Sequence, residues 1–275
     1  PGTQELKKLA PMDTQETLDR FFDRMEESEG SLLLLDYDGT LAPFRPNRLE
    51  AVPAEGIREL LDDILSCENS RVVLVTGRPT EEVLGLLQLS QPIEVWGCHG
   101  REYRSLDGEV KPVGVSQQDM EALDRARGEI RHLIEPMRID YKTGCLALHC
   151  RGLSHEEEQH IANAAREIWA PYVKEEGLKI YPFDGGIELA VPGRSKGDAV
   201  NALLEEIDPD SLAVAFLGDD QTDEDGFRAL GDRGLSVLVR NEPQETDADI
   251  RITMPEGVRE FFRRWAQTAR KEVTP

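Results

Sequence analysis

Two aspartates in the first part of the chain directly follow a strongly apolar segment. Asp36 and Asp38 come after residues 31–35, which include a run of leucines, and before Gly39 and Thr40. Leucines without alternation indicate a strand buried on both faces, as in a parallel sheet between layers of helices. Ligands of such sheets bind beyond the carboxyl ends of the strands, so Asp36 is placed to face a site. The alternative is an ordinary turn or a fragment of a calcium-binding loop.

A second acidic segment follows another apolar run late in the chain. Residues 212–217 read as a strand, and residues 218–224, with the sequence GDDQTDE, come directly after it. Carboxylates this close together are costly unless a cation or solvent compensates them. Asp219 would meet Asp36 and Asp38 if the two strands are neighbours. These hard oxygen donors suit Mg²⁺, which is the cofactor we expect.

A lysine and a threonine stand at further positions that suit an anion. Ser195 is a good helix N-cap, so Lys196 would project from the first helical turn, beside amides that favour an anion. A solvent-exposed lysine is the alternative. Residues 71–79 read as a strand that ends in Thr76 and Gly77 before a helix.

Composition and charge limit the partners. The formal charge is 32 minus 54, or −22, so we expect neither nucleic acid nor a membrane as a partner. A phosphorylated substrate would need a local positive potential from a metal ion, a lysine or backbone amides. No apolar run approaches the length of a membrane span, and no leader pattern opens the sequence, which favours a cytoplasmic location. The 4 cysteines form no CxxC pair and are expected to be reduced.

The order of elements predicts an α/β fold with two parts. Strands and helices alternate before residue 112 and after residue 186, whereas the segment between them resembles α+β structure. We expect a Rossmann-like parallel sheet core with helices on both faces, formed by residues 1–111 and 187–275. Residues 112–186 would form an inserted α+β domain.

These motifs resemble, in order and spacing, those of the haloacid-dehalogenase-like phosphohydrolases. The resemblance rests on Asp36-x-Asp38-Gly-Thr, Thr76-Gly, Lys196 and Gly218-Asp219-Asp220. The longer segments DYDGTLAP, TGRP, GCHGRE and GDDQTDED resemble the trehalose-6-phosphate phosphatase family in particular. The similarity extends from about residue 30 to 265.

The resemblance implies a mechanism. Asp36 would attack phosphorus and form an aspartyl-phosphate, and Asp38 would act as the general acid and then the general base. Asp36, the Asp38 carbonyl and Asp219 would hold Mg²⁺, while Lys196 and Thr76 would contact the phosphoryl oxygens. Two further acidic residues would lie behind the metal ligands: Asp220 and Asp223.

The inserted domain is similar to the cap of this family, which binds the sugar. The positions that match the sugar-binding motifs are Asp140, Lys142 and Glu188, and Gly77 and His99 are further expected substrate contacts. Asp140 stands where the family has Glu, and Cys150 stands where it has Tyr. A carboxylate that is one methylene shorter changes which hydroxyl it can reach. The alternative for Asp140 and Lys142 is a solvent-exposed strand face.

The expected function is Mg²⁺-dependent hydrolysis of a sugar phosphate monoester, first of all trehalose 6-phosphate. A phosphatase for another glycosyl phosphate, such as glucosylglycerol phosphate, is the second hypothesis, favoured by Asp140 and the acidic surface. A non-catalytic sugar-phosphate sensor or regulatory domain is the third. We also expect a functional or fused link to a sugar-phosphate synthase.

Overall fold

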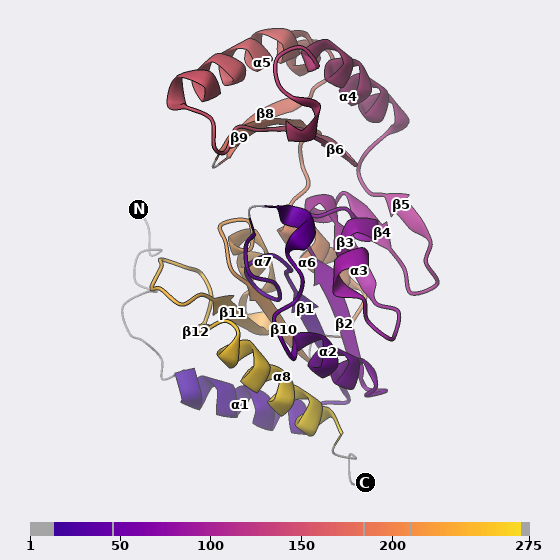
Figure 1. Ribbon diagram of the computed structural model, residues 1–275. Helices are drawn as coiled ribbons and strands as arrows, with labels where there is room; N and C mark the ends of the chain where they lie inside the picture. The colour runs from indigo at the N-terminus through magenta and orange to yellow at the C-terminus, as the bar shows by residue number, and fades with distance from the viewer. Residues whose placement is uncertain (1–13, 46, 184, 209–210, 271–275) are drawn as a thin grey trace, which may run out of the picture. The chain divides into compact units, whose positions relative to one another are not determined.

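The computed structural model describes residues 14–45, 47–183, 185–208 and 211–270 (Figure 1). The chain divides into two compact units. The first contains the described residues of Pro1–Val75, Glu82–Glu94 and Lys196–Pro275, and the second contains Thr76–Glu81 and Val95–Ser195. The domain boundaries expected from the sequence, at residues 112 and 186, stay a prediction.

A parallel sheet forms the centre of the first unit. Its strands lie in the order β12-β11-β10-β1-β2, and each neighbouring pair is parallel. Their bounds are β1 Gly30–Leu35, β2 Ser70–Val75, β10 Leu212–Gly218, β11 Leu235–Val239 and β12 Ile250–Ile252. Every residue of β1 is buried, so the sheet is covered on both faces at its centre, as the leucine run predicted.

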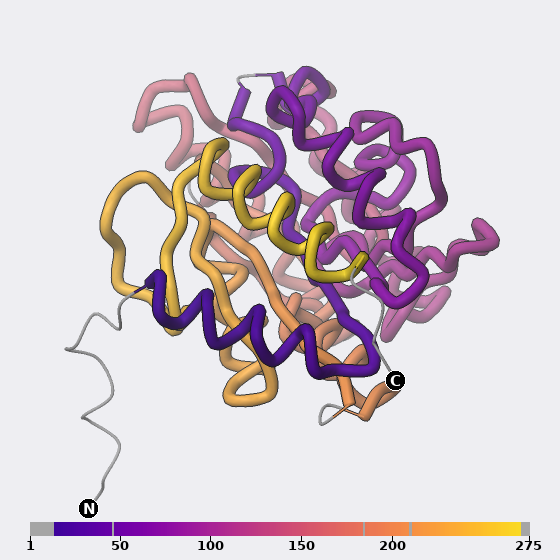
Figure 2. Tube along the Cα trace, turned by 90° about the horizontal axis from the view of Figure 1, so that it is seen from below, coloured from indigo at the N-terminus to yellow at the C-terminus, as the bar shows by residue number. Residues whose placement is uncertain are grey.

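Two groups of helices pack against this sheet. One group consists of α1, α2 and α8, and the other of α6 and α7. Their bounds are α1 Thr14–Glu27, α2 Ile57–Leu65, α6 Lys196–Glu205, α7 Glu224–Leu230 and α8 Glu256–Ala269. Figure 2 shows α1 and α8 side by side. Aromatic side chains of the two helices pack together, with 5.4 Å between the ring centroids of Phe22 and Phe261.

The second unit contains antiparallel strands and helices. Strands β3, β4 and β5 pair in antiparallel fashion, and a separate antiparallel sheet has the order β6-β7-β9-β8. The bounds are β3 Glu94–Gly97, β4 Glu102–Arg104, β5 Val110–Pro112, β6 Ile139–Lys142, β7 Cys145–His149, β8 Lys179–Phe183 and β9 Gly186–Ala190. The helices are α4 Gln117–Ile130, α5 His155–Glu175 and the start of α3 Thr80–Leu87, whose residues from Glu82 on belong to the first unit. Short 3-10 turns lie at Arg48–Glu50, Cys98–Gly100, Pro136–Arg138 and Gly231–Arg233.

The alternation along the β6-β7-β9-β8 sheet separates an apolar face from a polar one. Leu146, Leu148, Ile187 and Leu189 pack with the inner sides of α4 and α5 in one hydrophobic core. Because side chains alternate along a strand, the residues between them point to the opposite face. The predicted α/β fold, with a parallel sheet and an additional α+β region, is confirmed.

The structure also bears on the membrane and on the cysteines. No helix within the described ranges combines the length and the apolar character needed to cross a bilayer. All four cysteines are buried free thiols, as the sequence predicted.

Candidate active site

The two acidic segments meet because their strands are neighbours. Leu35 of β1 lies opposite Leu217 of β10, and the Asp36 amide donates a hydrogen bond of 2.9 Å to the Leu217 carbonyl. Parallel neighbours end at the same edge of a sheet, so Asp36 and Asp219 emerge together there. The sequence predicted that Asp219 would lie near Asp36 if their strands were neighbours, and in the structure these strands are paired.

The turn after β1 closes tightly around Asp219. Gly39 has a φ of +78°, and a Cβ atom at this position would lie 2.0 Å from Asp219 Oδ2. Only glycine avoids both the strained backbone and this overlap. In the same turn Asp38 is partly exposed, whereas Thr40 is fully buried and its hydroxyl lies 3.4 Å from Asp36 Oδ2.

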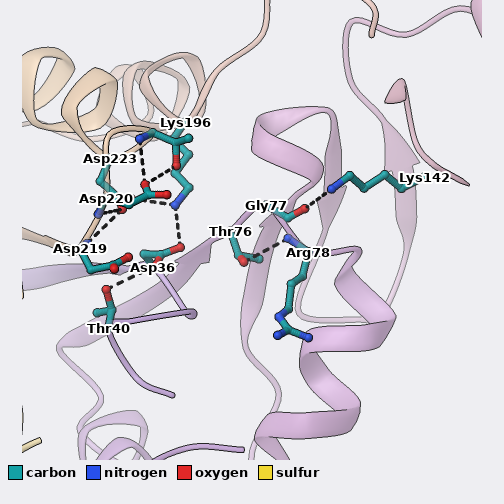
Figure 3. Close-up of polar contacts among 11 residues, drawn as sticks. Asp36, Thr40, Thr76, Gly77, Arg78, Lys142, Lys196, Asp219, Asp220 and Asp223 are labelled. Carbon is teal, nitrogen blue, oxygen red and sulfur yellow. Dashed lines mark hydrogen bonds and ion pairs between the residues drawn. The ribbon is translucent and has the colours of Figure 1, made fainter. Parts of the chain in front are cut away.

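Lys196 enters this site from the start of α6. Its ammonium donates hydrogen bonds of 2.6 Å to Asp36 Oδ1 and 2.8 Å to Asp223 Oδ1, as Figure 3 shows. The side chain is only 3% exposed, which contradicts the alternative of a surface lysine. Burial alone would lower the pKa of Lys196, but the carboxylates of Asp223 and Asp36 raise it well above its ordinary value.

Asp223 connects this lysine to the backbone of the second acidic segment. Its Oδ2 accepts hydrogen bonds from the amides of Asp219, at 3.1 Å, and Asp220, at 3.2 Å. A Cβ atom on Gly218 would lie 2.3 Å from Asp223 Cγ, so glycine is required here as well. The carboxylate of Asp220 turns away to accept from the amide and hydroxyl of Thr222. Both oxygens of Asp223 are therefore already occupied within the protein.

We call Asp36, Lys196, Asp219 and Asp223 the acidic cluster. Oxygens of its carboxylates lie within 4.8 Å of one another, and all are buried. Burial raises the pKa of Asp36 well above its ordinary range, although Lys196 opposes this effect. Burial and the neighbouring carboxylates raise the pKa of Asp219 to about 8, and burial is the main cause that raises that of Asp223 to about 6.

This electrostatic imbalance fits a divalent cation. Several buried carboxylates face a single ammonium, so negative charge remains uncompensated. Within the part of the chain that the structure describes, the Asp219 carboxylate accepts no hydrogen bond, unlike that of Asp223. A hard cation with oxygen ligands would supply the missing positive charge.

Thr76 and Gly77 follow β2 and belong to the second unit. Thr76 is buried, and its hydroxyl accepts a hydrogen bond of 3.2 Å from the Arg78 amide. A Cβ atom on Gly77 would lie 2.5 Å from the His99 ring. The Gly77 carbonyl accepts a hydrogen bond of 3.1 Å from Lys142 (Figure 3). The structure thus brings Thr76, Gly77, His99 and Lys142 into one neighbourhood.

We call Asp140, Lys142 and Glu188 the polar sheet face. Asp140 pairs with Ala147, which pairs with Glu188, so these positions share the face opposite the hydrophobic core. The side chains of Asp140 and Lys142 are 10% and 11% exposed, and their charged atoms lie 3.6 Å apart. Glu188 accepts a hydrogen bond of 3.1 Å from Cys145. The alternative of a solvent-exposed pair is therefore wrong.

His149 ends β7 and Cys150 follows it directly. His149 Nε2 lies 3.7 Å from Asp140, too far for a hydrogen bond. Cys150 is buried in the hydrophobic core, so its position does not present a polar group to this face. Burial alone would lower the pKa of Lys142, but the negative groups around it, Asp140 among them, raise it.

A residue outside the sequence motifs also supports the acidic cluster. Arg240 follows β11 and donates a hydrogen bond of 3.2 Å to the backbone carbonyl of Asp219. The signal that identified Asp36 and Asp219, a polar residue directly after a buried strand, applies to Arg240 too.

Comparison with known proteins identifies the family of this chain. The sequence model of the family described as trehalose-phosphatase matches residues 34–255. Trehalose-phosphate phosphatase B of Arabidopsis thaliana is 27% identical over 264 residues, which cover 88% of this chain and 68% of that protein. A solved structure described as a trehalose-6-phosphate phosphatase related protein is 28% identical, with a TM-score of 0.73, and the match covers 86% of this chain and 97% of that one.

A more distant structure shares the fold. A haloacid dehalogenase-like hydrolase from Bacteroides thetaiotaomicron has a TM-score of 0.61 at 17% identity, covering 86% of this chain and 99% of that one. The family match includes both segments that build the acidic cluster. The resemblance that the motifs indicated is confirmed, and the chain belongs to the trehalose-phosphatase family, within the haloacid-dehalogenase-like fold.

Proposed function

We propose that this member of the trehalose-phosphatase family hydrolyses trehalose 6-phosphate to trehalose and phosphate in a Mg²⁺-dependent reaction. Its family makes it a phosphoric monoester hydrolase. The observation that carries the proposal is the buried pair of Lys196 and Asp36, 2.6 Å apart, within the acidic cluster. A carboxylate held by an ammonium at the end of a central strand is suited to attack phosphorus in an anionic substrate.

The metal would be held by carboxylates of the acidic cluster and one backbone carbonyl. Asp36 and Asp219, with the backbone carbonyl of Asp38, are the proposed ligands. Among the described residues nothing donates to the Asp219 carboxylate, whereas Asp223 accepts from Lys196 and from two backbone amides. When bound, Mg²⁺ would neutralise the phosphoryl oxygens and the surrounding carboxylates.

The protein side chains would carry the reaction in two displacements. Asp36 attacks phosphorus, so that an aspartyl-phosphate bond forms while the bond from phosphorus to the sugar oxygen breaks. Asp38, which is partly exposed, donates a proton to the departing sugar oxygen. It then accepts a proton from the water that attacks the aspartyl-phosphate, which releases phosphate and restores Asp36.

Other residues would stabilise charge and orientation. Lys196 offsets the charge of the phosphoryl group, and Asp223 holds this ammonium at a fixed position. The Thr76 hydroxyl contacts a phosphoryl oxygen. The polar sheet face, with Gly77 and His99, would contact the hydroxyls of the sugar.

A second candidate substrate is another glycosyl phosphate, such as glucosylglycerol phosphate. Asp140 favours it, because its short carboxylate lies 3.6 Å from Lys142 and has a different reach from the Glu expected at this position. A non-catalytic sensor is less well supported, because the acidic cluster is intact. A link to a sugar-phosphate synthase and a cytoplasmic location stay predictions.

The test is phosphate release from the purified chain. We expect release from trehalose 6-phosphate in Mg²⁺, loss of release in excess EDTA, and recovery when Mg²⁺ is restored. Faster release from glucosylglycerol phosphate would favour the second substrate. Tight binding of both compounds without phosphate release in Mg²⁺ would contradict the phosphatase and favour a sensor.

A further inference from the structure

Glu102 lies outside the expected site residues but bonds to two segments that carry them. It begins β4, directly after the turn that contains His99 and Arg101. Its Oε1 accepts hydrogen bonds from the amide of Thr80, at 2.8 Å, and from the hydroxyl of Thr80, at 2.7 Å. Its Oε2 accepts a hydrogen bond of 2.6 Å from the hydroxyl of Thr143. All of these residues belong to the second unit.

The two partners of Glu102 are close in sequence to residues that are proposed to contact the substrate. Thr80 begins α3, shortly after Thr76 and Gly77, and Thr143 directly follows Lys142 in the turn between β6 and β7. Lys142 in turn donates to the Gly77 carbonyl at 3.1 Å. The contacts form a closed ring that runs from Glu102 through the segment 77–80 to Lys142 and back through Thr143.

Capping of a helix explains only half of this arrangement. The amide of Thr80 is an unpaired donor at the start of α3, and a carboxylate oxygen satisfies it. The second oxygen of Glu102 has no part in that cap, because it binds a hydroxyl 41 residues further along the chain. Thr80 is fully buried, and hydrogen bonds to an ionised carboxylate are stronger than neutral ones.

We propose that Glu102 is a positioning residue that keeps Lys142 in register with Thr76 and Gly77. The carboxylate of Glu102 links Lys142, the proposed sugar contact, to the loop with Thr76, the proposed phosphoryl contact. Both would then be placed to contact the same substrate molecule. The inference rests on the proposed function, and it assigns to Glu102 no contact with substrate.

The test compares a substrate that has a sugar with one that lacks it. Thr143→Val removes the hydroxyl at nearly constant shape, so the Lys142 side of the ring is released while the Thr80 side stays bound. We expect KM for trehalose 6-phosphate to rise about 5- to 10-fold, the size of one lost hydrogen bond. We expect kcat for this substrate and kcat/KM for p-nitrophenyl phosphate to stay within about 2-fold. A purely structural defect would lower activity on both substrates together.

A double-mutant cycle tests whether Thr143 acts through Glu102. Glu102→Ala should impair both substrates, because it releases both sides of the ring, and adding Thr143→Val should then change KM no further. Glu102→Gln keeps the shape of the side chain and one carbonyl acceptor, so it should recover most of the activity on p-nitrophenyl phosphate. If Glu102→Ala does not fold, the cycle is run in the Glu102→Gln background, where the effect of Thr143→Val should shrink.

Asp62→Ala provides the matched control. Asp62 of the first unit also accepts from the amide and hydroxyl of one residue, Ser90, at 2.8 and 2.9 Å, although it uses one oxygen for each. Its removal should leave both KM values unchanged. An unchanged KM for the sugar phosphate in Thr143→Val, or full additivity in the cycle, would overturn the proposal while the proposed function stands. Absence of trehalose 6-phosphate hydrolysis by the unmodified chain would overturn both.

Discussion

The acidic cluster of the first unit and the polar sheet face of the second use the same residue types in different surroundings. Lys196 is 3% exposed and bonds to two carboxylates at 2.6 and 2.8 Å. Lys142 is 11% exposed, stands 3.6 Å from Asp140, and hydrogen-bonds to a backbone carbonyl. Groups held at hydrogen-bond distance by several partners have little freedom, whereas groups at longer distances can adjust to a ligand. Under the proposed function, the acidic cluster would be the site of the reaction, and the more widely spaced Asp140 and Lys142 would contact the sugar.

The largest expected effect is on the acidic cluster. Asp36→Asn should lower kcat by at least about 10⁴-fold, because the amide cannot form the aspartyl-phosphate, and phosphate release measures this. Asp63→Asn is the control, since that carboxylate makes an exposed ion pair with Arg270. Melting temperature should not fall in Asp36→Asn, because one of several like charges is removed. Normal turnover by this variant would defeat the assignment of the nucleophile.

A smaller and more selective effect is expected at the polar sheet face. Lys142→Met should raise KM for trehalose 6-phosphate about 10- to 100-fold, as for a lost hydrogen bond to a charged group. It should change hydrolysis of p-nitrophenyl phosphate by less than about 3-fold. The control is Lys174→Met, since Lys174 is exposed on α5. Equal losses on both substrates would remove the distinction between the two regions.

The smallest effect concerns the stability of the acidic cluster. The pKa of Asp219 is raised from 3.8 to about 8 in the folded protein, so the folded state binds this proton more tightly than the unfolded state does. Its contribution to stability is complete below about pH 4 and is lost as the pH rises through about 8. Without metal, the melting temperature should therefore fall more steeply between pH 5 and 8 in the native protein than in Asp219→Asn.

Magnesium sharpens this test. Because the ion binds the ionised carboxylates of the folded state, Mg²⁺ should raise the melting temperature more at pH 8 than at pH 5. The increase should be largely absent in Asp219→Asn. An equal increase at both pH values in both proteins would place the ion elsewhere.

The sequence could predict the parts of the site that follow from strand ends. The apolar runs before Asp36 and Asp219 identified two buried strands, and parallel neighbours bring their ends together. The helix cap at Ser195 predicted where Lys196 begins its helix. Contacts between side chains of turns that are distant in sequence leave no such local pattern in the sequence. Glu102 and Thr143 are an example, since nothing in the local pattern of either residue indicates the other.

The close approach of Gly39 to Asp219 has a consequence for sequence change in this protein. Any side chain at position 39 must displace a carboxylate oxygen rather than solvent. Saturation mutagenesis should therefore recover glycine alone at a position that is partly exposed and would otherwise tolerate many residues. Sequence change in one acidic segment is therefore restricted by the other, although Asp219 follows Gly39 by 219 − 39 = 180 positions along the chain.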